Sequence, residues 1–223
     1  MKKAVFIDHK EGELDPAVFS RISKNFDNTE MCQRDDPQIL AKVKEADAFF
    51  VKISTKVDKE LIDAASHLKY VGVCSTAFDA IDAKYARTKG VTVCNLGGYS
   101  TGAVSEFFFA ALFEVARDLE AGKNQARKED YGFANFMGLE LQHKTLGVVG
   151  AGAIGSRIAE IGRGIGMNVI YFSRKNKPVI EKLGATKKTL EDVLQQSDFI
   201  SVNLSLNAET KGILSEEKLA LTK

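Results

Sequence analysis

The sequence has few cysteines and almost no excess of charge of one sign, and each shortage argues against a class of protein. Its 223 residues include three cysteines, Cys32, Cys74 and Cys94, without the Cys-x-x-Cys spacing of a zinc or redox motif. We therefore expect no disulfide framework and no metal site, but a protein of a reducing compartment. Cys74 and Cys94 each end an apolar run, which favours buried thiols. Lys and Arg number 31 and Asp and Glu 30, so no charge excess indicates a nucleic acid or an anionic membrane as partner.

Long hydrophobic runs are also missing. The first apolar run, residues 4–7, ends at Asp8 and is too short for a signal peptide. No run approaches the ~20 apolar residues that cross a bilayer. We therefore expect a cytoplasmic protein that does not span a membrane.

The first hundred residues alternate short apolar runs with amphipathic segments. The runs are rich in Val, Ile and Phe and do not alternate with polar residues, which is typical of strands buried on both faces of a parallel sheet. This repeated pattern predicts a parallel α/β sheet with right-handed crossovers. The strands are predicted at 4–8, 48–52, 70–74 and 91–95, and the helices at 16–26, 37–46, 58–65 and 82–89.

The second half begins with a strongly apolar segment. Residues 101–120 predict one long helix with apolar side chains almost all round, which we expect to be buried between two layers or domains. Residues 122–138 show little periodicity and predict an irregular arm, or a surface for a partner. A second α/β pattern follows, with strands predicted at 145–150, 168–172 and 199–204, helices at 153–164, 178–183 and 190–196, and a last helix with Ser215 as its N-cap.

The turn between the first strand and helix of this second pattern holds the most informative motif. Gly150, Gly152 and Gly155 have the spacing Gly-x-Gly-x-x-Gly, with a buried-strand pattern before them and an apolar-faced helix after them. In a dinucleotide site the first glycine permits the tight turn, the second lets the pyrophosphate approach the backbone, and the third lets helix and strand pack. The N–H groups and the positive end of the helix then bind the phosphates. The alternative is a glycine-rich turn that binds nothing.

The residues after the second strand of this pattern favour one cofactor. A site selective for NAD(H) usually has Asp or Glu about 20 residues beyond the glycines, where it binds the ribose hydroxyls. Here strand 168–172 is followed by Ser173, Arg174 and Lys175, with no carboxylate from 174 to 178. Because arginine binds a 2′-phosphate through charge-assisted, fork-shaped hydrogen bonds, we expect a preference for NADP(H), with NAD(H) as the alternative. If the two cations are only solvated loop residues, both cofactors would bind alike.

Several further segments fit one family when they are taken together. They are Ser54-Thr-Lys-Val-Asp-Lys-Glu-Leu-Ile62, the repeated aspartates of 68–82, the hinge-like Asn95-Leu-Gly-Gly-Tyr99, the approach to the glycine loop at 141–147, and the strand and loop at 197–210. In this order and spacing, from about residue 50 to the end, the chain resembles the D-isomer-specific 2-hydroxyacid dehydrogenase family, of the glyoxylate and hydroxypyruvate reductase kind. It departs from the family's pattern at Ala77-Phe78, where Gly-Tyr is usual, at Gly97, where proline is common, and at Asn203-Leu-Ser205, where His-x-Pro is usual.

The resemblance implies a flavodoxin-like substrate domain over residues 1–98, followed by a Rossmann dinucleotide-binding domain over residues 99–223 that is incomplete at its C-terminus. It implies hydride transfer between NADP(H) and a small 2-oxo or 2-hydroxy acid, and the apolar helix and the arm favour a homodimer. Backbone N–H groups of Thr76 and Ala77 would bind the substrate carboxylate. The residues that the resemblance adds to the cofactor site, beside the three glycines and Ser173, Arg174 and Lys175, are Val104, Ala153, Ile154, Asn203, Leu204 and Thr210.

No residue of the chain is assigned a catalytic role. An arginine, an acid and a histidine perform the family's chemistry, and the resemblance places all three beyond Lys223. His9, His67 and His143 lie outside the cleft motifs, which favours surface or loop positions. On this hypothesis the chain is an inactive part of an enzyme of roughly 310–340 residues. The alternative function is a dinucleotide-sensing binding module of the corepressor type, because one fold can serve several functions.

Overall fold

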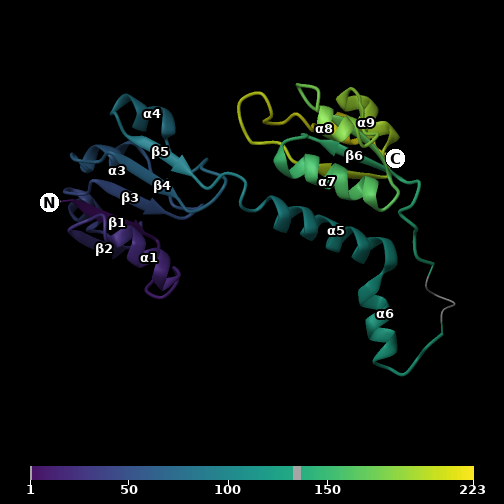
Figure 1. The fold of residues 1–223 in the computed structure, drawn as a ribbon, viewed down its shortest axis with the longest axis horizontal. Coiled ribbons are helices and arrows are strands. Elements are labelled where there is room, and N and C mark those ends of the chain that lie inside the picture. The colour runs from purple at the N-terminus through teal and green to yellow at the C-terminus, as the bar shows by residue number, and fades with distance from the viewer. Residues whose placement is uncertain (1, 133–136) are drawn as a thin grey trace. The chain divides into compact units, whose positions relative to one another are not determined.

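The chain folds into two units. The computed structural model describes residues 2–132 and 137–223. The two compact units are Met1–Tyr99 and Ser100–Lys223, and Figure 1 shows a sheet with its own helices in each of them. Among the described residues, no helix has the length and apolarity needed to cross a membrane.

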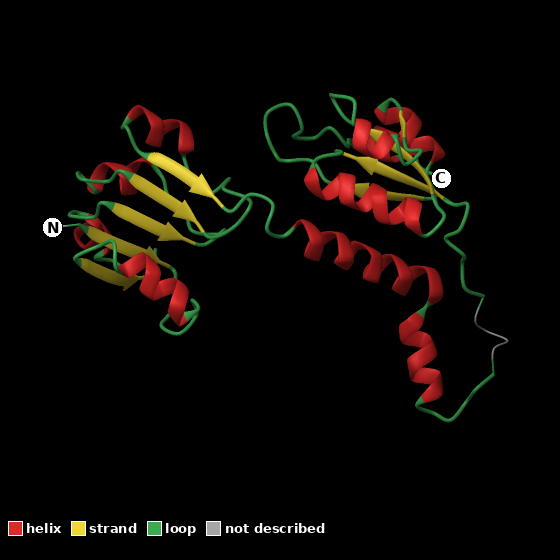
Figure 2. Cartoon of the chain, viewed as in Figure 1, coloured by secondary structure: helices red, strands yellow, loops and turns green. Residues whose placement is uncertain are grey.

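The first unit is a parallel sheet with helices on both faces. Its strands lie in the order β2-β1-β3-β4-β5, which is the flavodoxin-like order, and every pairing is parallel. The α/β fold predicted for this part of the chain is therefore confirmed (Figure 2). The strands are β1 (Lys3–Ile7), β2 (Asn28–Cys32), β3 (Ala48–Val51), β4 (Tyr70–Val73) and β5 (Thr92–Asn95), and the helices are α1 (Pro16–Ser23), α2 (Ile39–Val43), α3 (Lys59–Ala64) and α4 (Ala83–Thr88).

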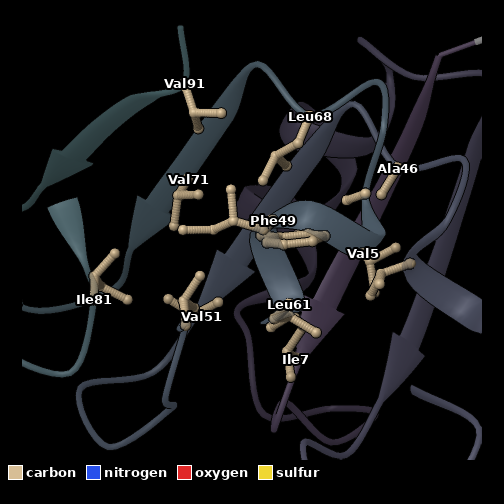
Figure 3. Packing of buried hydrophobic residues seen from close by; sticks show 14 of the residues in the cluster. Val5, Ile7, Ala46, Phe49, Val51, Leu61, Leu68, Val71, Ile81 and Val91 are labelled. Carbon is tan, nitrogen blue, oxygen red and sulfur yellow. The ribbon is translucent and has the colours of Figure 1, made fainter. Parts of the chain in front are cut away.

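The core of this unit forms where alternate strand residues meet one layer of helices. In Figure 3, Val5, Phe49 and Val71 of neighbouring strands lie in one apolar cluster with Leu61 of α3, and all four are buried. The opposite face of the same strands is also apolar, since the rings of Phe6 and Phe50 stack with centroids 4.9 Å apart. Burial on both faces explains why these strands are continuous apolar runs.

Strand β2 was not predicted. Its sequence, Asn-Thr-Glu-Met-Cys, is mostly polar, and only Cys32 is buried. The strand lies at one edge of the sheet and pairs with β1 alone. An edge strand needs no apolar side chains on both faces, so hydrophobic pattern does not reveal it.

Helices α3 and α4 begin at capping aspartates. The side chain of Asp58 accepts a hydrogen bond from the N–H of Leu61 at 3.1 Å, and that of Asp82 accepts one from the N–H of Tyr85 at 3.0 Å. These contacts satisfy N–H groups that the first turn of a helix leaves without partners. They also place each helix start one residue later than the sequence pattern predicted, at Lys59 and Ala83.

The second unit is a parallel sheet in the order β8-β7-β6-β9, the order of the first four strands of a Rossmann fold. This confirms the predicted fold class of the second half. The short strand β8 was not predicted, because two exposed residues carry no periodic pattern. The strands are β6 (Thr145–Val149), β7 (Asn168–Phe172), β8 (Thr186–Lys187) and β9 (Phe199–Val202), and the helices are α5 (Thr101–Arg117), α6 (Leu119–Ala126), α7 (Ala153–Gly164), α8 (Pro178–Glu181), α9 (Leu190–Gln196) and α10 (Glu216–Leu219).

The long apolar helix differs from its prediction in two ways. Helix α5 ends at Arg117, since Asp118 adopts a left-handed backbone with φ of 46°, and α6 then turns away from it (Figure 1). Helix α6 therefore occupies part of the segment predicted to be an irregular arm, of which residues 133–136 lie outside the described residues. The expected burial all round α5 was wrong, because only one face packs against α7, while Phe107 and Val115 are each 76% exposed.

The predicted environments of two cysteines and one histidine also need correction. Cys74 is half-buried and Cys94 is exposed, because β5 is an edge strand, whereas Cys32 is the buried thiol. Burial, followed by the charge of a neighbouring glutamate, raises the pKa of Cys32 to about 11. His9 lies in a loop as predicted but is buried, with 3% of its surface exposed.

Candidate functional site

The glycine loop lies between the ends of three strands of the second unit. The N–H of Gly150 donates to the carbonyl of Phe172 at the end of β7, and the N–H of Asn203 donates to the carbonyl of Val149 at the end of β6. Gly150 has φ of +95°, and a Cβ there would lie 2.8 Å from the backbone oxygen of Asn203. Because L side chains rarely adopt this backbone and the contact is with rigid backbone, the turn requires glycine here.

Gly155 and Gly152 differ sharply in what surrounds them. A Cβ on Gly155 would lie 2.1 Å from the carbonyl oxygen of Gly150, so this glycine permits helix α7 to approach the turn. A Cβ on Gly152 would meet no atom of residues 2–132 or 137–223 within 4 Å. Packing within the chain therefore explains Gly155 but not Gly152. Open space in front of the backbone is what the pyrophosphate of a dinucleotide needs.

Helix α7 adds N–H groups and a positive helix end to this space. Gly152 is its N-cap and provides no side-chain hydrogen bond to the first turn. Ala153 and Ile154 are the first two helical residues, and both are at least partly exposed. The first N–H groups of a helix have no partner within the helix and favour an anion. The residues of this loop therefore fit the pyrophosphate of a bound dinucleotide.

A cation-lined cavity lies at the end of β7. It has a volume of about 370 Å³ and is lined by Ser173, Arg174, Lys175 and Lys177. Lys177 was not among the predicted site residues, although it is only two positions beyond Lys175. Its backbone N–H donates to the hydroxyl of Tyr171 at 3.0 Å, and this contact positions the loop. Three cations and a hydroxyl around one cavity fit the phosphate chemistry that the sequence indicated.

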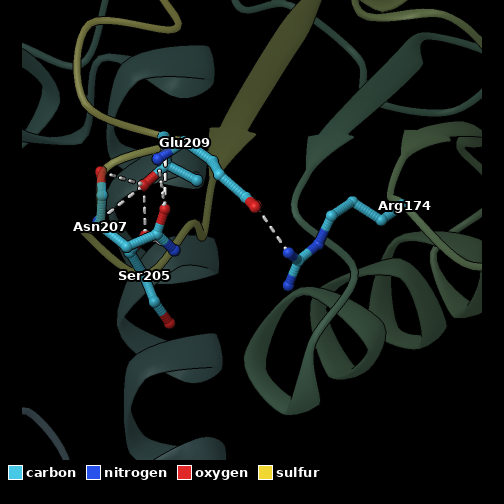
Figure 4. Close-up of polar contacts among 5 residues, drawn as sticks. Arg174, Ser205, Asn207 and Glu209 are labelled. Carbon is cyan, nitrogen blue, oxygen red and sulfur yellow. Dashed lines mark hydrogen bonds and ion pairs between the residues drawn. The ribbon is translucent and has the colours of Figure 1, made fainter.

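Arg174 already has one partner in the structure. Its Nη1 atom donates to Oε2 of Glu209 at 2.7 Å, and the two side chains are 81% and 70% exposed (Figure 4). Sequence reasoning missed Glu209, because the expected carboxylate was sought directly after β7 and Glu209 follows β9 instead. The spacing of 35 residues between the two partners gave no signal of their proximity.

The loop after β9 contacts the glycine loop. A Cβ on Gly150 would lie 2.9 Å from Cδ2 of Leu204, so Leu204 lies against the turn. The side-chain amide of Asn203 donates to the hydroxyl of Ser201 at 3.0 Å. The hydroxyl of Thr210 donates to the carbonyl of Ser205 at 2.6 Å, and it accepts from the N–H of Asn207. Thr210 thus stabilises the shape of this loop.

The first unit presents Thr76 and Ala77 in a loop that follows β4. The N–H of Leu96 donates to the carbonyl of Ser75 at 2.9 Å, and the side-chain amide of Asn95 donates to the carbonyl of Thr76 at 2.6 Å. In a trans peptide the N–H is opposite the carbonyl. The N–H groups of Thr76 and Ala77 therefore both point away from residues 95–96.

Val104 is the remaining predicted site residue. It lies in the first turn of α5, where its N–H donates to the carbonyl of Ser100 at 2.9 Å, and its side chain is 42% exposed. Within the second unit, α5 packs against α7, the helix that begins at the glycine loop.

A Rossmann-type sheet with a glycine loop, an open helix N-terminus and a cation-lined cavity defines a dinucleotide-binding α/β protein. Comparison with known families agrees, since residues 109–223 match the D-isomer specific 2-hydroxyacid dehydrogenase, NAD binding domain. The chain therefore belongs to the D-isomer-specific 2-hydroxyacid dehydrogenase family, as its motifs indicated.

Individual relatives are similar over part of their length. A glyoxylate reductase of Aeropyrum pernix is 37% identical over 223 residues, which cover 95% of this chain and 66% of that protein. A glyoxylate reductase of Thermococcus litoralis is 38% identical over 193 residues, which cover 83% of this chain and 58% of that protein. The chain thus spans about three fifths to two thirds of the length of these curated relatives.

Solved structures show the same arrangement of elements. A D-lactate dehydrogenase of Aquifex aeolicus, complexed with NAD and lactic acid, superposes with a TM-score of 0.89 at 26% identity. The superposition covers 99% of this chain and 66% of the lactate dehydrogenase chain. An acyclic imino acid reductase in complex with NADPH and D-Arg superposes with a TM-score of 0.87 at 29% identity, covering 100% of this chain and 71% of its own. These two relatives of similar fold thus bind different nicotinamide cofactors.

Proposed function

We propose that this chain is part of an oxidoreductase that transfers a hydride between NADP(H) and a small 2-oxo or 2-hydroxy acid. The open space in front of Gly152 supports dinucleotide binding most directly, because no contact among the described residues accounts for a glycine there. The similarity to glyoxylate reductases supports a substrate of the glyoxylate kind. In this proposal residues 1–98 bind the substrate and residues 99–223 bind the cofactor.

Each part of the site has a separate task. The bound nicotinamide supplies or accepts the hydride. The glycine loop, with Ala153 and Ile154, holds the pyrophosphate on the N–H groups of α7. The N–H groups of Thr76 and Ala77 bind the substrate carboxylate, and Val104, Asn203, Leu204 and Thr210 shape the cofactor site. No residue of the chain is assigned to proton transfer.

The preference for NADP(H) rests on the cavity after β7. Ser173, Arg174 and Lys175, with Lys177, offer one hydroxyl and three cations to a 2′-phosphate. A hydrogen bond to a charged group contributes about 1.5–3 kcal/mol, and 1.4 kcal/mol is a factor of ten in affinity. We expect Arg174→Ala to weaken NADPH binding by about 10- to 150-fold and to change NADH binding less than about twofold.

Fluorescence titration of NADPH and of NADH with the wild type and with Arg174→Ala measures the dissociation constant of each cofactor. Arg127→Ala is a matched control, because Arg127 is an exposed arginine of the same unit, at the end of α6. Equal affinity of the wild type for NADH and NADPH would contradict the preference. Reduction of glyoxylate with NADPH by the whole protein tests the reaction itself, and binding without turnover there would favour the sensing module instead.

A homodimer is proposed from the outward face of α5. Phe107 and Val115 lie eight residues apart on this helix and are both 76% exposed. Large apolar side chains on one helix face are typical of a surface that another chain covers. A second copy of the chain would pair its own α5 with this face by a twofold axis.

A further inference from the structure

The fold brings a carboxylate to the place where the sequence shows none. No acidic residue lies between 174 and 178, directly after β7. Glu209, from the loop after β9, instead reaches the guanidinium of Arg174, with 2.7 Å between Oε2 and Nη1. The pair joins the loop after β7 to the loop after β9, and these two strands lie on either side of β6. Figure 4 shows the two side chains.

The position of Glu209 is fixed by the loop that carries it. The side-chain oxygen of Asn207 accepts hydrogen bonds from the N–H of Glu209 at 2.9 Å and from the N–H of Thr210 at 3.1 Å. The hydroxyl of Thr210 donates to the carbonyl of Ser205, which closes the turn. Figure 4 shows Ser205, Asn207 and Glu209 in this loop. These contacts hold the backbone of Glu209, so only its side chain must become ordered when it reaches Arg174.

We infer that Glu209 is a specificity-determining residue, which weakens binding of a 2′-phosphate by occupying Arg174. This inference rests on the proposed binding of NADP(H) at this cavity. A phosphate and a carboxylate need the same donor atoms of Arg174, and two anions at one guanidinium repel each other. A dinucleotide without the 2′-phosphate does not compete for Arg174, so its affinity is independent of the pair. Glu209 thereby reduces the preference for NADP(H) over NAD(H) without changing the affinity for NAD(H).

The size of the effect follows from the exposure of the pair. Both side chains are mostly exposed, and exposed ion pairs are weak and screened by salt. We expect Glu209→Gln to strengthen binding of a 2′-phosphate by about 1.4- to 5-fold at low salt, and less at high salt. The side-chain amide keeps the size of the glutamate while it removes the charge.

The test uses two small probes that differ only in this phosphate. Adenosine 2′,5′-bisphosphate carries the 2′-phosphate and adenosine 5′-monophosphate lacks it. Their dissociation constants are measured by calorimetry with the full chain, Glu209→Gln, Arg174→Ala and the double variant. Glu191→Gln is the matched control, since Glu191 also forms an exposed ion pair in this unit, with Lys218 at 3.2 Å.

The expected result has three parts. Glu209→Gln binds the bisphosphate more tightly and the monophosphate as before, the double variant binds both probes as Arg174→Ala does, and Glu191→Gln changes neither. If Arg174→Ala weakens the bisphosphate but Glu209→Gln does not strengthen it, the inference on Glu209 is overturned while the proposed cofactor preference stands. If Arg174→Ala leaves the bisphosphate unaffected, or the wild type does not distinguish the two probes, the proposed preference itself is overturned. If Glu209→Gln also tightens binding of the bisphosphate in the variant that lacks Arg174, the inference that Glu209 competes with the phosphate for Arg174 is overturned.

Discussion

Replacement of Gly152 by alanine should separate dinucleotide binding from folding. The added Cβ would meet no atom within 4 Å, and the backbone φ of −76° is open to alanine. Two small effects on stability oppose each other. Alanine reduces the freedom of the unfolded chain, which stabilises by about 0.4–1 kcal/mol, but it is a poorer N-cap residue than glycine by a similar amount. We expect the free energy of unfolding to change by less than about 1 kcal/mol.

The same methyl group would take the space through which the pyrophosphate approaches the backbone. Overpacking by one methyl group costs about 1–3 kcal/mol, and 1.4 kcal/mol is a factor of ten in a binding constant. The dissociation constants of NADPH and NADH should therefore both rise by about 5- to 150-fold. The loss should be equal for the two cofactors, because both carry the pyrophosphate.

Gly150→Ala is the contrasting variant in the same loop. Its Cβ would lie 2.8 Å from the backbone oxygen of Asn203, and its φ is +95°. A left-handed backbone costs an L residue about 1–2 kcal/mol, and overpacking against rigid atoms adds about 1–3 kcal/mol. We expect the free energy of unfolding to fall by about 2–5 kcal/mol.

Scanning calorimetry of the free proteins measures stability, and titration calorimetry measures cofactor binding. The reasoning is refuted if Gly152→Ala binds NADPH as tightly as the wild type, since the pyrophosphate then does not pass over Gly152. It is equally refuted if Gly152→Ala unfolds as readily as Gly150→Ala, since the space in front of Gly152 is then filled by the chain itself.

Two further predictions concern a buried histidine and an exposed helix face. Burial, and then the charge of Lys52, lower the pKa of His9, and within the described part of the chain neither ring nitrogen has a hydrogen-bond partner. As the pH falls, His9 of the unfolded chain binds a proton before His9 of the folded chain does. The free energy of unfolding therefore decreases as the pH falls below about 6.5, by at most about 1.4 kcal/mol per pH unit. Urea unfolding at pH 7.5 and 5.5 should show a smaller acid loss for His9→Leu than for the wild type or for His67→Leu, and an equal loss would contradict this account. In analytical ultracentrifugation, Phe107→Glu should change the sedimentation of the protein from that of a dimer to that of a monomer. Val179→Glu is the control and should not do so, because it changes a residue of α8 that is also exposed, at 75%. A wild-type protein that sediments as a monomer would refute the proposed dimer.

Much of the architecture could be predicted because local pattern and global fold agree. Apolar runs such as 4–7 and 145–149 are buried on both faces of a parallel sheet, so their composition already implies strands. The glycine loop was equally readable, since Gly150 and Gly155 are required by the backbone of the turn itself. Edge elements were missed for the opposite reason, because β2 and β8 bury little and have no apolar pattern.

Sequence by itself determined the strand–glycine–helix unit, because its requirements involve residues within a few positions of one another. Only tertiary structure decided which distant groups meet. Glu209 lies 35 residues from Arg174, and their contact depends on the placement of β7 and β9 on either side of β6, which the sequence pattern does not reveal. Likewise the burial of His9 depends on segments that cover the end of β1, and the exposure of Cys94 on the edge position of β5. Such properties belong to packing between distant segments, where composition and periodicity carry no information.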